Sequence, residues 1–424
     1  MIDSHPTFDV LGARARFPAL GRKVDGRSIV YFYGPGGTQV PDACIAGIVD
    51  YLSTSNANTH GRFAAGRETE ALLAEAHAAG ADFLGAQDAR EIVFGPNMTT
   101  LTFALSRAIG QTLRPGDEIV VTRLDHDANV APWLALEEER GAIIRWVDVR
   151  TEDCTLDLDG LEAAIGPRTR VVAVGLASNA VGTINPVARI GEMARTVGAW
   201  LWLDAVHAAP HVPIDVLGLG ADFLVCSPYK FFGPHLGMLW GRRELLESLP
   251  AYKVRPAGDE SPDRWQTGTA LHENLAGLLG TFRYLEGLGN PSPPEGGGTR
   301  RERLRAAMER IRTYERGLTP LLIERLEAVR GLKLRGITDP ARVDERCPTV
   351  AFTLAGHSPE EVATFLGQCG ISTWDGDYYA WELIRALGLA ENGGMLRVGL
   401  VHYNTAEEID RLCATLYELT HRTS

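Results

Sequence analysis

The stretch of residues 221–241, ADFLVCSPYKFFGPHLGMLWG, constrains the fold more than any other part of the chain. Its apolar run 223–226 is typical of a short buried strand, and proline and glycine residues interrupt regular structure after it. Ser227 and Lys230 are therefore expected at the rim of a hydrophobic core. Burial lowers the proton affinity of a lysine, which makes its amine a nucleophile, although most lysines are solvated surface charges.

A second apolar run, residues 199–203, ends at Asp204. Asp204 and Lys230 are separated by about one strand–connection–strand unit, so both can lie at the ends of neighbouring strands in one sheet. A carboxylate that keeps a pyridine nitrogen protonated and a lysine that forms a Schiff base are the pair that pyridoxal 5'-phosphate requires. The alternatives for Asp204 are a helix cap or a metal ligand.

The composition is that of an ordinary soluble protein, with 424 residues, 45% hydrophobic and 23% charged. The net charge of −12, without a basic run, argues against a nucleic-acid or membrane partner. Neither a membrane-spanning stretch nor a signal sequence is recognisable, so a cytoplasmic location is expected. The six cysteines are scattered without a CxxC pair, which favours reduced thiols over a metal site or disulfides.

Three segments are expected: an N-terminal arm at 1–30, a large domain at 31–290 and a small C-terminal domain at 291–424. The boundary is placed in the Pro/Gly-rich stretch 287–298. A long helix is predicted over 300–330, with strands near 332–336, 349–354, 370–373 and 395–401. Capping boxes at Ser358 and Thr405 predict two helix starts in the small domain.

Polar residues follow three further predicted strands. Strand 91–94 leads to GPNMTT, where a tight turn, hydroxyl groups and a helix N-terminus form a potential anion site. Strand 117–124 leads to DHDAN, and strand 169–176 leads to SNAVG. Each motif alone is weak, because a threonine is also a normal helix cap and a lone histidine is more often structural.

The motifs FGPNMTT, LDHDANVAPW, ASNAVGTINPV, LDAVHA, SPYKFFGP and QTGTA occur in this order, and together they are specific. They resemble aminotransferase class V, in the cysteine-desulfurase-like branch of the fold-type I pyridoxal phosphate enzymes. The resemblance extends from YFYGPGGTQVP near the start to MLRVGLVHYNTAEEIDRL near the end. It implies an α/β large domain with a mostly parallel seven-stranded sheet between helices, a smaller C-terminal α+β domain, a homodimer and a small amino-acid substrate.

The resemblance also implies a role for individual residues. Lys230 would remove the substrate α-proton, Asp204 would hold the cofactor ring cationic, and His126 would stack on the ring and assist proton transfer. The other cofactor contacts are assigned to Met98, Thr99, Asn179, His207, Ser227 and Tyr229. Thr269, in the loop 265–274, would reach the cofactor of a partner subunit. His207 stands where close desulfurases often carry glutamine, and Tyr229 where they usually carry histidine.

The resemblance places the substrate contacts around Arg397, which aligns with the arginine that binds the substrate α-carboxylate in the family; a planar guanidinium suits that anion. The other expected contacts are Gly37, His60, Trp374, Tyr378 and Tyr379. A turn at Gly37 and a surface loop at His60 are the alternatives for those two residues.

The chain departs from the desulfurases at the position of their nucleophilic cysteine, which is occupied by Tyr379. A phenol cannot accept sulfane sulfur as a persulfide, and nearby Cys369 is expected in the core. Trp374 replaces a second arginine of the loop. The first hypothesis is therefore a C–S lyase that acts on an S-substituted cysteine by β-elimination. Similar enzymes occur in natural-product pathways, including that of the lincosamide antibiotics.

Several activities remain as alternatives on the same scaffold. They are a decarboxylating oxidative deaminase, an aminotransferase, an epimerase, a true cysteine desulfurase and a non-catalytic cofactor-binding protein. The intact set of Asp204, Lys230, His126 and Arg397 argues against the last, because a scaffold needs no grip on an α-carboxylate.

Overall fold

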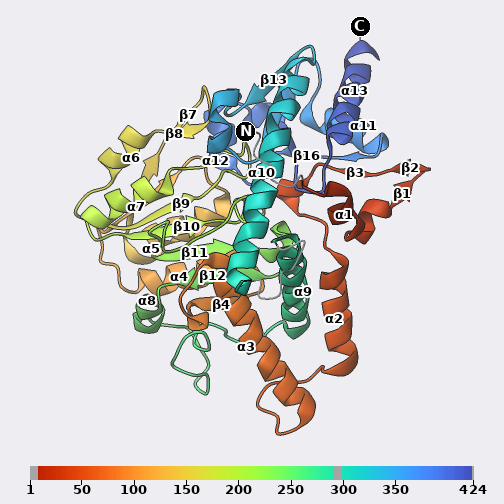
Figure 1. Cartoon of the computed structure of the whole chain (residues 1–424). Coiled ribbons are helices and arrows are strands. Elements are labelled where there is room, and N and C mark those ends of the chain that lie inside the picture. The colour runs from red at the N-terminus through yellow and green to blue at the C-terminus, as the bar shows by residue number, and fades with distance from the viewer. Residues whose placement is uncertain (1–7, 290–297, 423–424) are drawn as a thin grey trace, which may run out of the picture.

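The computed structural model describes residues 8–289 and 298–422, which form two main sheets surrounded by helices (Figure 1). The larger sheet has seven strands in the order β4-β12-β11-β10-β9-β5-β6. Their bounds are β4 (Ile92–Gly95), β5 (Glu118–Thr122), β6 (Ile143–Val147), β9 (Thr169–Gly175), β10 (Trp200–Asp204), β11 (Phe223–Cys226) and β12 (Gly237–Gly241).

The strands from β11 to β6 pair in parallel, and only β12 is antiparallel to its two neighbours. The central strands β9 to β12 are almost entirely buried, because helices cover both faces of a parallel sheet. The predicted mostly parallel seven-stranded sheet is confirmed. Two separate hydrophobic clusters, one on each face, form the core.

Eight helices belong to this part of the described chain. They are α2 (Asp42–Thr54), α3 (Ala64–Leu84), α4 (Met98–Gly110), α5 (Ala131–Arg140), α6 (Leu158–Ala164), α7 (Val187–Thr196), α8 (Arg243–Ser248) and α9 (His272–Gly289). Helices α2 and α9 lie side by side (Figure 1) and touch closely, since a Cβ added at Gly280 would lie 2.1 Å from the carbonyl oxygen of Ala43.

The smaller sheet is antiparallel, with the order β13-β14-β17-β16. Its strands are β13 (Leu332–Arg335), β14 (Thr349–Leu354), β16 (Trp374–Gly376) and β17 (Met395–Gly399). The neighbouring helices are α10 (Arg300–Glu327), α11 (Pro359–Gln368), α12 (Trp381–Ala386) and α13 (Ala406–Arg422). The predicted capping box at Ser358 is present, and Thr405 and Glu408 exchange the hydrogen bonds of the other. Helix α10 crosses from the large-sheet region to the small sheet (Figure 1).

The structure corrects some predicted segments. The strand predicted over 370–373 is β15 (Ile371–Ser372), which pairs with β3 (Val30–Tyr31) from the N-terminal part of the chain and not with the small sheet. Helix α9 continues through the start of the predicted linker to Gly289, and residues 290–297 lie outside the described residues. The long helix α10 ends at Glu327, three residues before its predicted end.

The described part of the N-terminal arm begins at residue 8, and residues 1–7 lie outside it. It contains α1 (Val10–Ala15), from which Arg14 donates a hydrogen bond to the carbonyl oxygen of Tyr403 and pairs with Glu408 at 2.9 Å. The remaining short strands are β1 (Lys23–Val24), β2 (Arg27–Ser28), β7 (Val149–Arg150) and β8 (Thr155–Leu156). None of the helices within residues 8–289 and 298–422 is both long and apolar enough to cross a membrane.

Candidate active site

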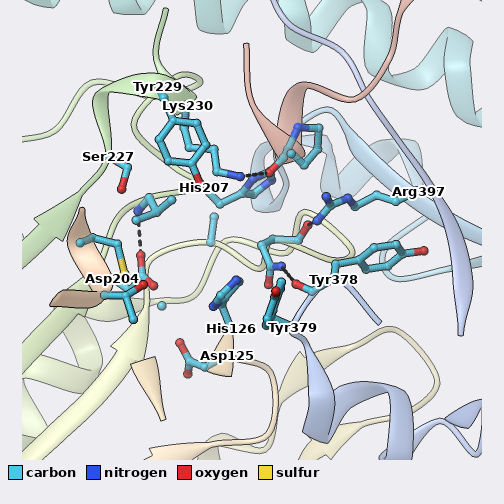
Figure 2. Close-up of a pocket in the computed structure, with 18 of the residues that line it drawn as sticks. Asp125, His126, Asp204, His207, Ser227, Tyr229, Lys230, Tyr378, Tyr379 and Arg397 are labelled. Carbon is cyan, nitrogen blue, oxygen red and sulfur yellow. Dashed lines mark hydrogen bonds between the residues drawn. The ribbon is translucent and has the colours of Figure 1, made fainter. Parts of the chain in front are cut away.

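A cavity of about 250 Å³ opens at the carboxyl ends of β5, β9, β10 and β11 (Figure 2). This edge is where open α/β sheets bind their ligands, because loops diverge there around a crevice. The predicted site residues that line the cavity are Met98, Thr99, His126, Asn179, Asp204, His207, Ser227, Tyr229, Lys230, Trp374, Tyr378, Tyr379 and Arg397. Residues more than 290 positions apart in the sequence therefore meet at one site.

Lys230 lies in the short 3-10 helix η5 (Pro228–Lys230), directly after β11 and Ser227. Its Nζ donates to the carbonyl oxygen of Pro35 and lies 4.9 Å from the centre of the Tyr229 ring. Burial and the charge of Arg397 lower the pKa of Lys230 to about 7, and the Asp204 carboxylate opposes this shift. A large fraction of the amine is therefore unprotonated, and nucleophilic, near neutral pH.

Asp204 is the last residue of β10 and is buried. Its Oδ1 accepts a hydrogen bond of 2.8 Å from the backbone N–H of Val206. Burial raises the pKa of Asp204 to about 6, while this hydrogen bond and Lys230 work in the opposite direction. A carboxylate with raised proton affinity and remaining acceptor capacity suits a cationic N–H donor in the cavity.

Two histidines line the cavity in their neutral forms. Burial, with the charges of Lys230 and Arg397, lowers the pKa of His126 to about 4. The Nδ1 of His126 accepts from the N–H of Ala128 at 3.0 Å, so its proton is assigned to Nε2. Burial also places the pKa of His207 well below its usual value, and its buried Nε2 has no hydrogen-bond partner in the described residues.

Helix α4 points its N-terminus at the cavity. Its cap is Asn97, whose Oδ1 accepts from the N–H of Thr100 at 2.8 Å, and Met98 and Thr99 of the first turn line the cavity. First-turn amides lack partners within their helix and carry the positive end of the helix dipole. The arrangement can hold a phosphate group.

Arg397, in the middle of β17, is almost fully buried. One guanidinium nitrogen donates to the carbonyl oxygen of Asn179 at 2.8 Å, while the buried Nε has no partner in the described residues. Burial lowers the pKa of Arg397 to about 10, which leaves it cationic at neutral pH. The side-chain Nδ2 of Asn179 donates to the carbonyl oxygen of Tyr378 at 2.9 Å, and the contact of Asn179 with the cofactor stays a prediction.

Two predicted substrate contacts do not line the cavity. The side chain of His60 is 92% exposed and lies 3.5 Å from the carboxylate of Glu70, and its contact with a substrate stays a prediction. Gly37 packs against the ring of Tyr229, since a Cβ added at Gly37 would lie 3.4 Å from Cδ2 of that ring. Its neighbour Gly36 lines the cavity instead. Thr269 lines a separate hollow with Thr100 and Gln266, and its contact with a partner subunit's cofactor stays a prediction.

The sequence interpretation missed several lining residues: Pro35, Gly36, Asp125, Gly175, Ala177 and Val206. Asp125 is the most polar of them, and burial raises its pKa to about 7 against hydrogen bonds from Thr122 and Asn129. Its place beside His126, at the end of a buried strand, was the signal that could have identified it.

None of the six cysteines lines the cavity. Five are buried, and Cys369 is half-buried at the end of α11, where its carbonyl oxygen accepts from Arg411 at 2.7 Å. Tyr379, at the position where the resemblance would place the nucleophilic cysteine, is exposed and lines the cavity.

The residues present fit pyridoxal 5'-phosphate. The cavity offers an amine with lowered pKa, a buried carboxylate and a helix N-terminus, and the orphaned polar atoms Asn179 Oδ1, His207 Nε2 and Arg397 Nε belong to residues that line it. Such atoms are costly unless a ligand or water satisfies them.

Comparisons with known proteins agree with this chemistry. The family model described as Aminotransferase class-V matches residues 30–290 and 302–412. The chain is 33% identical over 423 residues to a probable cysteine desulfurase of Mycolicibacterium paratuberculosis, with 96% of this chain but only 58% of that protein covered. It is 32% identical over 423 residues to a probable cysteine desulfurase of Streptomyces coelicolor, covering 95% of both chains.

Two solved structures have the same architecture. The cysteine desulfurase from Thermococcus onnurineus NA1 has a TM-score of 0.84 at 26% identity, with 96% of this chain and 97% of that chain covered. A cysteine desulfurase from Escherichia coli has a TM-score of 0.82 at 26% identity, with 98% and 99% covered. These matches confirm the predicted fold class.

Proposed function

The chain belongs to the aminotransferase class-V family of pyridoxal 5'-phosphate-dependent enzymes, and from this premise we propose that it is a C–S lyase acting on an S-substituted cysteine by β-elimination. One observation carries the proposal. Lys230, Asp204 and Arg397 line the cavity together with the aromatic side chains of Trp374, Tyr378 and Tyr379, but no thiol lines it.

The residues of the cavity divide the work of holding and activating a substrate. Met98 and Thr99 would hold the cofactor phosphate, and Asp204 would accept the pyridine N–H. Arg397 would bind the α-carboxylate with the part of its guanidinium that Asn179 does not use. When bound, pyridoxal 5'-phosphate withdraws electrons from the substrate α-carbon and so acidifies its proton. With its lowered pKa, Lys230 is suited to accept that proton and to return it to the departing sulfur.

The absence of a lining thiol favours elimination over desulfuration. The relatives are named cysteine desulfurases, and the resemblance implies that such enzymes take up sulfur on a cysteine. Tyr379 cannot do so. In elimination, the Cβ–S bond breaks with its electron pair going to sulfur, which leaves as a thiol after taking up a proton. Water then converts the remaining enamine into pyruvate and ammonia.

The direct test is to incubate the cofactor-loaded protein with S-substituted cysteines and, separately, with free cysteine. We expect equal amounts of thiol, pyruvate and ammonia from the S-substituted substrates and no sulfide from free cysteine. Sulfide from cysteine under reductant would restore the desulfurase alternative. Amino transfer to an added oxo acid, hydrogen peroxide or a racemised product would each replace elimination with the corresponding alternative.

A matched pair of lysine variants ties the result to the cavity. Lys230→Ala should lose the visible absorbance of the lysine-linked cofactor and all thiol release. Lys333→Ala, on the small-sheet strand β13, should keep both. Retained thiol release in Lys230→Ala would remove Lys230 from the proposed mechanism.

The proposal includes a homodimer, in which Thr269 would serve the partner's site, and a cytoplasmic location. Exposed apolar side chains at Ile45, Val49 and Leu52, on one face of α2, support association, and six unpaired cysteines support a reducing compartment. Light scattering of the purified protein tests the dimer. A role in a sulfur-containing natural-product pathway rests on the sequence resemblance alone.

A further inference from the structure

Two neighbouring tyrosines at the cavity have backbone conformations that bulky residues rarely adopt. The φ angles of Tyr378 and Tyr379 are 53° and 58°, in the left-handed region. Such a conformation is strained and persists only where the surroundings enforce it. The contacts of these two residues must therefore compensate for the backbone strain.

Hydrogen bonds fix the backbone on both sides of the strained pair. The carbonyl oxygen of Tyr378 accepts from Asn179 Nδ2 at 2.9 Å, and that of Tyr379 accepts from the N–H of Asp127 at 2.7 Å. The N–H of Tyr379 donates to Asp377 Oδ1 at 2.9 Å. Asn179 and Asp127 both follow strands of the large sheet, so the large sheet holds the loop that precedes α12.

The side chain of Tyr378 is directed to Arg397. The guanidinium carbon lies 4.3 Å from the centre of the tyrosine ring, and Figure 2 shows the two side chains running alongside each other. The hydroxyl group of Tyr378 donates to the carbonyl oxygen of Met395, at the start of the same strand as Arg397. The ring is therefore anchored at both ends, through its backbone and through its hydroxyl.

Through these contacts, each of the three residues Arg397, Asn179 and Tyr378 touches the other two. Arg397 donates to the backbone of Asn179, Asn179 donates to the backbone of Tyr378, and the Tyr378 ring covers one face of the Arg397 guanidinium. We propose that Tyr378 is a positioning residue that, together with Asn179, orients Arg397 for the substrate α-carboxylate. The inference deepens the proposed function and rests on the carboxylate-binding role given there to Arg397.

Arg397 needs such restraint because a long, flexible side chain loses conformational entropy when it binds a ligand in one orientation. A guanidinium binds a carboxylate best through two parallel N–H groups at its edge, which requires a fixed plane. Tyr378 occupies a face and Asn179 one edge, so both restrain the plane without using Nε, which has no partner in the described residues. The cation–π contact is desolvated, which places it at the strong end of its range.

The first test compares the binding of an amino acid with that of its decarboxylated counterpart. Norvaline and butylamine, which have a methylene group in place of the sulfur and so cannot undergo elimination, are titrated into the cofactor-loaded protein, and visible absorbance gives each Kd. Wild type should prefer the carboxylate. Tyr378→Leu should reduce that preference roughly thirtyfold, the size of a desolvated cation–π contact, with the amine's Kd unchanged. Tyr252→Leu, an exposed tyrosine outside the cavity lining, is the matched control and should bind like wild type.

A second pair of variants separates the electrostatic role from a loss of packing. Tyr378→Phe keeps the ring but lacks the hydroxyl, and pentafluorophenylalanine at position 378 keeps the shape while reversing the charge distribution of the ring face. Tyr378→Phe should keep most of the preference for carboxylate, and the fluorinated variant should lose it. Equal preferences in these two variants, or an unchanged preference in folded Tyr378→Leu, would overturn the inference.

Proteolysis of the cofactor-free protein tests, without the reaction, whether the hydrogen bond from Asn179 to Tyr378 restrains the loop before α12. Tyr379, in the loop before α12, and Trp381, the first residue of α12, are exposed chymotrypsin sites. Asn179→Ala should speed cleavage there, and Tyr252→Leu should not. Equal cleavage rates in Asn179→Ala and wild type would contradict the restraint of this loop by Asn179. If wild type shows no preference for the carboxylate, the role of Arg397 in the proposed function fails and the positioning role fails with it. If wild type prefers the carboxylate and Tyr378→Leu does so equally, only the positioning role fails.

Discussion

The ring of Tyr379 stacks on the imidazole of His126, with ring centroids 5.3 Å apart and planes inclined by 24°. Tyr379 is 70% exposed, whereas burial lowers the pKa of His126 to about 4. The tyrosine therefore covers part of a half-buried histidine, at the position where the resemblance would place a reactive thiol (Figure 2).

Removing that ring should raise the proton affinity of His126. In Tyr379→Ala, water reaches the imidazole, the cost of its charged form falls, and its pKa should move from about 4 towards the ordinary value of 6.5. Titration of the His126 ring protons by NMR in the cofactor-free protein measures the shift. Tyr379→Phe keeps the stacking and serves as the control; an identical His126 pKa in both variants would show that the ring does not shield the histidine.

The pKa of Lys230 should respond in opposite directions to its two charged neighbours. Arg397→Gln removes a cation that disfavours the ammonium form, so the pKa should rise above about 7. Asp204→Asn removes an anion that favours the ammonium form, so the pKa should fall below about 7. The pH midpoint of the rate at which cofactor-free protein takes up pyridoxal 5'-phosphate reports the pKa, since only the unprotonated amine reacts. Midpoints that move together would contradict the assignment of these charges.

The large sheet and most of the site were predictable because of where their residues stand in the sequence. Asp204, His126 and Ser227 each follow a buried apolar run, and the ends of parallel strands meet at one edge. Local signals fixed these positions, and the motifs in their order identified the family. Asp125 obeys the same rule and was missed because it carried no motif role of its own.

The contacts of the loop before α12 were not predictable in this way. No local pattern indicates that Tyr378 adopts a positive φ or that its ring reaches Arg397, since these follow from tertiary contacts with Asn179 and Met395. The pairing of β15 with β3 was not predicted for the same reason, because a two-residue strand has no periodicity that identifies its partner.

Acid should destabilise the protein partly through His77 of α3. Burial lowers its pKa from 6.5 to about 4, while its Nδ1 donates to the carbonyl oxygen of Ile92 at 2.9 Å. Between these values the unfolded chain binds a proton that the folded protein does not, so the stabilisation present above pH 6.5 is lost as the pH falls through 4. The contribution to the free energy of unfolding is about 1.4 kcal/mol per pH unit.

Urea unfolding of His77→Gln between pH 6.5 and pH 4 measures this contribution. The variant keeps an N–H donor for Ile92 but cannot titrate, so its stability should fall less steeply with acid than that of wild type. His60→Gln removes a histidine whose side chain is 92% exposed and should leave the slope unchanged. Equal slopes in wild type and both variants would place the acid sensitivity elsewhere.

Gly182, three residues after Asn179, should tolerate no side chain. Its φ is +81°, and an added Cβ would lie 2.7 Å from the carbonyl oxygens of Cys347 and Thr349. Gly182→Ala therefore adds a steric clash to backbone strain, and should cost more than the 1–2 kcal/mol or so expected for a left-handed alanine alone.

Gly198→Ala isolates the strain, because Gly198 has a φ of +73° with no atom within 4 Å of an added Cβ. Thermal unfolding should therefore rank wild type above Gly198→Ala and Gly198→Ala above Gly182→Ala. The clash should push the turn that contains Asn179 and Gly182 away from residues 347–349. Because Arg397 donates to the carbonyl oxygen of Asn179, only Gly182→Ala should also weaken carboxylate binding. Equal losses of stability in the two variants would mean that the packing around Gly182 yields to the extra methyl group.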